Sequence, residues 1–171
     1  MKLLGAVLLF FVCTMMGFWK ARQYVKRSEE LRQLRGSLSA LETEITYGAT
    51  PLHLACQQIG EREPGAVGRF FTHFAKQLSQ SEGRATFECW QQALFDMKSE
   101  LSLREQDRTI LIRLGNKLGL SDKRDQLHHL RLAQTTLEAE EAHAIRERDK
   151  YEKMYRNLGV LAGALLVILM Y

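Results

Sequence analysis

Histidine, cysteine and acidic side chains are the residues of this chain that could support acid–base or metal chemistry. An HExxH pair on a helix would place two imidazoles on one face to hold a zinc ion, and the sequence contains no such pair. No two histidines lie four positions apart beside a carboxylate, as helical metal binding requires. We therefore interpret five residues as surface or helix-cap histidines: His53, His73, His128, His129 and His143.

A glutamate cluster at Glu138, Glu140 and Glu141 could in principle act as an acid–base set. It is better explained as the solvated face of a long helix, with Arg146 and Arg148 nearby as ion-pair partners. The sequence also has no Walker A motif and no GxGxxG at the start of a helix, so it offers no phosphate cradle. We therefore predict no catalytic, cofactor-binding or metal-binding residue and no small-molecule substrate. A membrane enzyme with an unfamiliar site is the least favoured hypothesis.

The three cysteines are Cys13, Cys56 and Cys89. An odd number of cysteines without close pairs does not suit a disulfide framework. We expect reduced thiols that pack as small apolar side chains.

Each end of the chain carries an uncharged apolar segment. Residues 3–19 form 17 positions without a charge, and residues 158–171 form 14 more. As helices they reach about 25 and 21 Å, against a hydrocarbon core of about 30 Å. We predict a transmembrane helix at 1–20, a cytoplasmic helical domain at 21–157 and a second transmembrane helix at 158–171. A half-inserted C-terminal tail is an alternative for the second segment.

A cleaved signal peptide is the alternative for the first segment. It would need a basic leading region and a small-residue cleavage site. Only Lys2 precedes the apolar run, and the sequence from Met16 to Lys20 is a poor peptidase target. We therefore expect an uncleaved span.

Basic residues predict the orientation of both spans. They follow the first span at Lys20, Arg22, Lys26 and Arg27, and they precede the second at Lys150, Lys153 and Arg156. Beyond the spans there is only Lys2. Because cytoplasmic flanks of membrane helices are enriched in Lys and Arg, we predict that the body lies in the cytoplasm and that both termini lie on the opposite side.

Four small residues are spaced so that the two spans could pack closely. Cys13 and Gly17 lie four positions apart, as do Gly159 and Gly163, so each pair shares one face of its helix. Such spacing lets membrane helices approach. We predict that the antiparallel spans pack through these residues. The alternative is that Gly159 and Gly163 face another subunit or lipid.

The body between the spans has the periodicity of helices and no strand pattern. Leu31, Leu34, Leu38, Leu41 and Ile45 are spaced 3, 4, 3 and 4, which gives one apolar helix face. Four further apolar faces follow, and the last helix has no Gly or Pro before Gly159. We predict an all-α, six-helix cytoplasmic bundle whose long first and last helices continue into the two transmembrane spans.

The ends of these helices carry capping signals. Gly48 ends the first helix, Thr50-Pro51 supplies an N-cap and a first helical residue, and Ser102 with Glu105 matches a capping box. Ser121 is the expected cap of the last helix. Residues 20–157 carry 23 Lys and Arg against 20 Asp and Glu, which is too balanced to indicate nucleic-acid binding.

Several short sequences along the whole chain resemble the stage III sporulation protein AB family of endospore-forming bacteria. The resemblance rests on KLLGA at 2–6, LRQLR at 31–35, LETEITYG at 41–48, TPL at 50–52, LG at 114–115 and 118–119, Asp122, Gln126, YEKM at 151–154 and LGVLAG at 158–163. It implies a sporulation protein of the mother cell, in the outer forespore membrane, within a channel or feeding-tube-like assembly that has a forespore partner. It also implies a cytoplasmic region similar to the inner-membrane platform proteins of type II secretion and type IV pilus machines.

Two functions follow from this resemblance and from the expected topology. The favoured one is a non-enzymatic membrane adaptor that couples a cytoplasmic ATPase to the transenvelope assembly and contacts its other membrane proteins. The alternative is a regulatory membrane protein whose helical domain binds a soluble partner without an export role. Neither function requires a cofactor.

Overall fold

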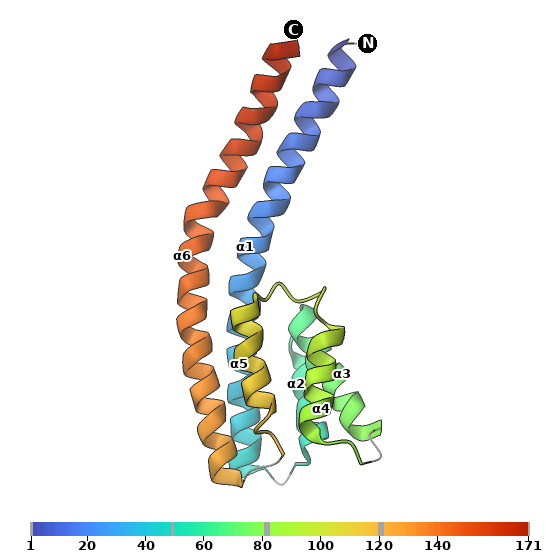
Figure 1. Ribbon diagram of the computed structural model, residues 1–171, viewed down its shortest axis with the longest axis vertical. Helices are drawn as coiled ribbons and strands as arrows, with labels where there is room; N and C mark the ends of the chain where they lie inside the picture. Colours follow the sequence, from blue (N-terminus) through green and yellow to red (C-terminus); the bar gives the residue numbers. More distant parts are fainter. Residues whose placement is uncertain (1, 49, 81–82, 120–121, 171) are drawn as a thin grey trace. The chain divides into compact units, whose positions relative to one another are not determined.

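The structure is a computed structural model that describes the backbone of residues 2–48, 50–80, 83–119 and 122–170. Side chains are described for Met15, for residues 22–151 outside those gaps, and for Lys153, Met154, Asn157, Leu158 and Leu161. The regular elements of the described chain are all helices: α1 (Lys2–Tyr47), α2 (Leu52–Arg62), α3 (Gly65–Gln80), α4 (Thr86–Asp96), α5 (Glu105–Gly115) and α6 (Lys123–Met170) (Figure 1). The prediction of an all-α, six-helix chain is confirmed.

The chain divides into two compact units. One comprises Met1–Ser28 with Ala142–Tyr171, and the other comprises Glu29–Glu141. Helices α1 and α6 contribute to both units. Among the described residues, no helix is both apolar enough and long enough to span a membrane. The predicted span boundaries therefore stay predictions.

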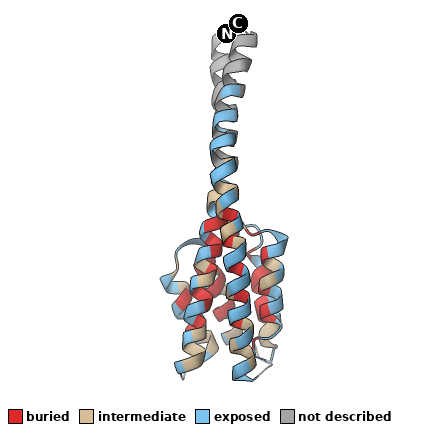
Figure 2. Ribbon diagram, turned by 90° about the vertical axis from the view of Figure 1, so that its left-hand side faces the viewer, coloured by how far each residue is buried: buried red, intermediate tan, exposed pale blue. Residues whose placement is uncertain are grey.

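In the unit 29–141, α1 and α6 lie side by side. The predicted leucine face of α1 is fully buried at Leu31, Leu34, Leu38 and Leu41, while Ile45 is half-buried. Figure 2 shows such buried positions in red. Across from this face, α6 buries leucines at 130 and 137.

Polar contacts along the same two helices fix their register. Arg131 Nε lies 2.6 Å from Glu42 Oε1, and Lys123 Nζ donates to the Thr46 carbonyl at 2.9 Å. The hydrogen bond from Arg131, above all, holds the pKa of Glu42 below its usual range. Arg35 lies 3.0 Å from Glu138. Together these contacts set which turn of α1 faces which turn of α6.

The helices α3, α4 and α5 pack around one tryptophan. The ring of Trp90 in α4 is fully buried, with the rings of Phe70 and Phe74 from α3 each 4.9 Å away in edge-to-face geometry. Its indole N–H donates to the carbonyl of Leu111 in α5 at 2.8 Å. Gly115 leaves room for the ring, because a Cβ at this position would fall on the Trp90 side chain. Trp90 thereby fixes the positions of the helices on either side of α4.

Two glycines allow α2 and α3 to approach closely. A Cβ at Gly60 would lie 2.8 Å from the Gly68 carbonyl oxygen, and a Cβ at Gly68 would lie 2.8 Å from the Gly60 carbonyl oxygen. The two backbones therefore touch at a point where only glycine fits.

The helix caps differ in detail from those that the sequence predicts. Pro51 is the N-cap of α2 rather than its first residue, and its carbonyl accepts the amides of residues 54 and 55. At α5 the predicted Ser102–Glu105 box is wrong. The amide of Arg104 instead donates to Asp107 Oδ2 at 2.8 Å. Ser121 lies outside the described residues, and Asp122 Oδ1 accepts the amide of residue 125 at 2.8 Å.

In the unit formed by the two chain ends, two contacts join α1 to α6. The rings of Tyr24 and Tyr151 lie 5.4 Å apart. Near them, Arg27 Nη1 lies 3.3 Å from Glu147 Oε2, and the Arg27 side chain is only 4% exposed. Arg27, predicted as an orientation-setting cation, is therefore also neutralised within the protein.

Candidate functional site

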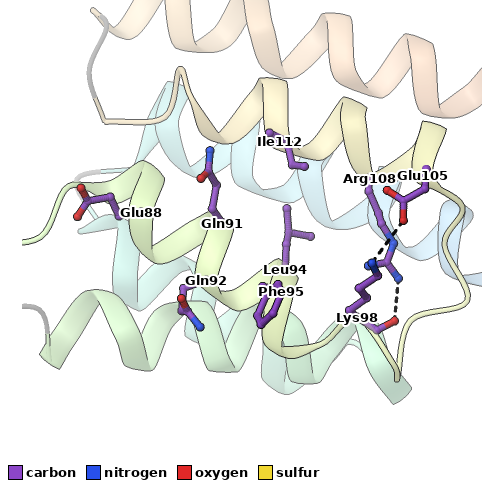
Figure 3. Close-up of a pocket in the computed structure, with 9 residues that line it drawn as sticks. All are labelled: Glu88, Gln91, Gln92, Leu94, Phe95, Lys98, Glu105, Arg108 and Ile112. Atoms are coloured by element: carbon purple, nitrogen blue, oxygen red, sulfur yellow. Dashed lines mark hydrogen bonds and ion pairs between the residues drawn. The ribbon is translucent and has the colours of Figure 1, made fainter.

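A groove between α4 and α5 is the candidate functional site of the unit 29–141. It has a volume of about 550 Å³, and Figure 3 shows the side chains of the two helices that line it. Nine side chains line it: Glu88, Gln91, Gln92, Leu94, Phe95, Lys98, Glu105, Arg108 and Ile112.

The floor and rim of the groove expose apolar surface. Leu94 forms buried floor at 6% exposure, whereas Phe95 is 72% exposed and Ile112 is 39% exposed. Exposed apolar side chains gathered beside a groove are a feature of interaction surfaces.

The polar side chains around the groove are mostly engaged with their own neighbours. Arg108 Nη2 donates to the Lys98 carbonyl at 2.7 Å, which fixes the α4–α5 connection. Lys98 Nζ lies 3.6 Å from Glu105 Oε1. Gln92 donates to Asp96 at 2.8 Å. The groove is thus an apolar hollow bordered by polar side chains that are already engaged with one another.

The sequence does not single out Phe95, because the apolar residues that predict α4 are those of its buried face. That face contains Phe87, Trp90, Leu94 and Met97, and Phe95 falls beside it among polar residues. An aromatic residue on the polar side of an amphipathic helix is the signal that could have identified the groove.

The histidines do not form a metal site in the described chain. No three His, Cys, Asp or Glu side chains gather there as a metal-binding group. His73 Nε2 lies 2.9 Å from Asp96 Oδ2, and chiefly this hydrogen bond lowers the pKa of Asp96 below its ordinary value. His129 lies 3.5 Å from Asp125, one turn earlier in α6. Gln77 and Gln92 also donate to Asp96, at 3.2 and 2.8 Å, so His73 belongs to a small polar network at the surface.

The cysteines and the glutamate cluster have structural surroundings. Cys56 and Cys89 are buried free thiols, and burial raises the pKa of Cys56 to about 12. Glu138 and Glu141 pair with Arg35 of α1, at 3.0 and 3.3 Å. The predicted partners in α6 are therefore wrong, since Arg35 approaches from a different helix.

The residues predicted to pack the spans and to orient them are only partly described. The side chains of four small residues and two cations lie outside the described ones: Cys13, Gly17, Gly159, Gly163, Lys20 and Arg156. The structure shows four of the remaining basic side chains exposed: Arg22, Lys26, Lys150 and Lys153.

Comparisons with known proteins agree along the chain. The family model described as stage III sporulation protein AB matches residues 2–171. Stage III sporulation protein AB of Bacillus subtilis (strain 168) is 42% identical over 170 residues, which is 99% of each chain. A solved structure of a stage III sporulation protein AB is similar with a TM-score of 0.70 and 38% identity, and the match covers 73% of this chain and 98% of that one.

Proposed function

We propose, since the chain belongs to the stage III sporulation protein AB family, that it is a non-enzymatic membrane platform of a sporulation channel assembly. In this role it couples a cytoplasmic ATPase to the other membrane proteins of the assembly. The proposed location is the outer forespore membrane, with the helical body in the mother-cell cytoplasm and both termini on the opposite side.

One observation carries the platform proposal: α1 and α6 each continue as a single helix from the body into an uncharged apolar end. Met15, Leu158 and Leu161, described within those ends, are 69%, 58% and 66% exposed. Exposed apolar side chains within an uncharged helical segment suit a lipid bilayer, which would cover them. Membrane attachment is therefore the arrangement that best accounts for these residues.

The α4–α5 groove supports the coupling part of the proposal. A platform has to bind a soluble partner, and the groove offers exposed Phe95 and Ile112 over a rigid base. Interface energies concentrate in such buried apolar anchors. We assign the ATPase-facing surface to this groove.

Co-purification tests the coupling. The full chain, solubilised in detergent, is mixed with the ATPase of the assembly and recovered on an affinity resin. We expect the double variant Phe95→Ser/Ile112→Ser to lose the ATPase while keeping its melting temperature. The matched control, Leu54→Ser/Leu132→Ser, removes two other exposed apolar side chains (42% and 55% exposed) and should retain the ATPase.

Either of two results would contradict this proposal. Retention of the ATPase by the Phe95/Ile112 variant would exclude the groove as the contact. Recovery of a different soluble partner, with no ATPase bound by the unaltered chain, would favour the regulatory alternative.

Cross-linking tests how the proposed spans meet. With Cys56 and Cys89 replaced, Cys13 and a Gly163→Cys substitution should form a disulfide within one chain if the small-residue faces pack together. Dimers between chains as the only product would assign these faces to assembly contacts and refute the intramolecular pairing.

A further inference from the structure

The unit formed by the two chain ends has an unbalanced charge. Residues 1–28 and 142–171 carry ten Lys and Arg against three Asp and Glu, a net charge of +7. Residues 29–141 carry fourteen against seventeen, a net charge of −3. The chain as a whole is only mildly basic because these two contributions offset each other.

Exposed cations make the excess accessible, and we call the four described ones nearest the apolar ends the basic belt: Arg22 and Lys26 on α1, and Lys150 and Lys153 on α6. All four are exposed. Within the described part of the chain, no carboxylate lies within ion-pair distance of any of them. Lys150 instead places its ammonium 5.3 Å from the Tyr151 ring centroid.

The spacing of the belt places like charges side by side on each helix, although Glu29 and Asp149 lie three and four positions from Lys26 and Lys153. Arg22 and Lys26 are four residues apart, and Lys150 and Lys153 are three apart, so each pair shares one helix face. Like charges at these spacings are destabilising. In the same unit, Arg27 is paired with Glu147. The buried Arg27 of this unit therefore has a carboxylate partner, whereas no described carboxylate pairs with the exposed cations of the belt.

The belt lies close to the apolar ends. Arg22 follows Trp19 by three residues, about 4–5 Å along a helix, and Lys153 precedes Leu158 by five, about 7–8 Å. Tyr24 and Tyr151 stack between the two helices at the same level. Amphipathic aromatic rings are typical of the headgroup layer.

We propose that the basic belt binds the headgroup phosphates of anionic phospholipids in the leaflet that faces the body. This inference rests on the proposed membrane attachment and adds a lipid preference to it. Anionic lipids supply the counter-charge that no described carboxylate places within ion-pair distance of the belt, at the depth where the belt lies. Each Lys or Arg near a membrane surface contributes about fivefold to binding of anionic lipid.

Quenching of tryptophan fluorescence by brominated lipids tests both the proposed membrane attachment and the proposed preference for anionic lipid. The chain has two tryptophans, and Trp90 is fully buried, so lipid contact is reported by Trp19. The full chain is reconstituted in vesicles that mix phosphatidylcholine and phosphatidylglycerol, with one or the other brominated. We expect the association constant for phosphatidylglycerol to exceed that for phosphatidylcholine by at least fivefold, and the excess to shrink in 1 M salt because screening shortens the electrostatic range.

Substitution of the belt should remove the preference. The variant Arg22→Gln/Lys26→Gln/Lys150→Gln/Lys153→Gln should bring the ratio close to one while quenching persists. The matched control removes four exposed cations of the other unit and should keep the ratio: Lys76→Gln/Arg84→Gln/Arg113→Gln/Arg124→Gln. A second variant that exchanges Arg for Lys and Lys for Arg within the belt keeps every charge and should also keep the ratio.

The possible failures are distinguishable. Equal quenching by the two lipids in the unaltered chain overturns the basic belt as a lipid site and leaves membrane attachment standing. A preference for phosphatidylglycerol that persists in the variant without the belt charges also refutes the belt as the lipid site. Absence of quenching by either lipid overturns membrane attachment itself, and the belt with it.

Discussion

Replacing Gly115 by alanine should destabilise the protein, although alanine is the better helix former. The added Cβ would overlap Cδ1 of Trp90 and would lie 2.8 Å from both Cγ and Nε1. The indole cannot move away freely, because two phenylalanine rings 4.9 Å away confine it and its N–H donates to the Leu111 carbonyl at 2.8 Å. The substitution therefore overpacks a fixed ring.

The size of the effect follows from three terms. Overpacking a core costs about 1–3 kcal/mol, and weakening the buried indole hydrogen bond adds about 1 kcal/mol. The gain in helix propensity returns about 1 kcal/mol. We expect a net loss of about 1–3 kcal/mol in the free energy of unfolding, which lowers the melting temperature by roughly 2–12 °C in a chain of this size.

Thermal unfolding of the detergent-solubilised full chain, followed by far-UV circular dichroism, measures the change. The matched control is Gly36→Ala in α1, where an added Cβ meets nothing within 4 Å. This control should raise stability by up to about 1 kcal/mol from propensity alone. If Gly115→Ala also raised the melting temperature, the confinement of Trp90 would be refuted.

Three further predictions concern single side chains. Glu30 is 5% exposed and accepts the Ser102 amide at 2.6 Å, so Glu30→Ala should cost about 1–3 kcal/mol in urea unfolding, whereas Glu30→Gln keeps an acceptor and should cost less; equal losses would contradict this role. The pKa of Asp96 lies below its ordinary 3.8, mainly through the hydrogen bond with His73, so its contribution to stability is complete above pH 3.8 and is lost as the pH falls through the lower pKa of the folded protein. The stability difference between the unaltered chain and Asp96→Asn should therefore be visible at pH 6 and should vanish in acid, and a difference that grew in acid would reverse the sign we assign. Burial raises the pKa of Cys56 to about 12, so its thiol is protonated at pH 8 and should react with maleimide only on unfolding, and rapid labelling of the folded chain, detected by mass spectrometry, would contradict its burial.

The sequence predicts the helices well because a single local pattern determines each of them. The four leucines of α1 repeat with helical spacing, and the structure buries all four. The phenylalanines of α3 behave in the same way at Phe70, Phe71 and Phe74. The periodic spacing of apolar residues over about 15 positions already shows which helix face will be buried. The helix can therefore be predicted without knowing which other helix packs against it.

Contacts between distant residues lie beyond this kind of prediction. The Ser102 amide is held by Glu30, 72 positions away, so Ser102 does not begin α5, and the cap passes to Arg104 with Asp107. The local sequence favours Ser102, which is the better N-cap residue type, and only a tertiary contact explains why α5 begins after Arg104. The pairing of Glu138 with Arg35 likewise depends on which helix lies beside α6.

The candidate site was the least accessible to prediction. The sequence contains no reactive constellation, and an apolar groove has no sequence motif, so its signal is a single exposed aromatic residue. Phe95 becomes informative only when its 72% exposure is known. Membrane attachment, by contrast, is a sequence prediction from the uncharged ends, and it awaits the quenching experiment.

The pairing of α1 with α6 has a consequence for how the protein is made. The last helix lies beside the leucine face of α1, and Glu42 and its partner Arg131 are 89 positions apart. At about 5–20 residues per second, a ribosome exposes this face for roughly 5–20 s before α6 can close it. Contacts of such long sequence separation also slow folding. Chaperones that bind leucine-rich helices have their opportunity in that interval, and a chain truncated before α6 would keep the face exposed for its whole lifetime.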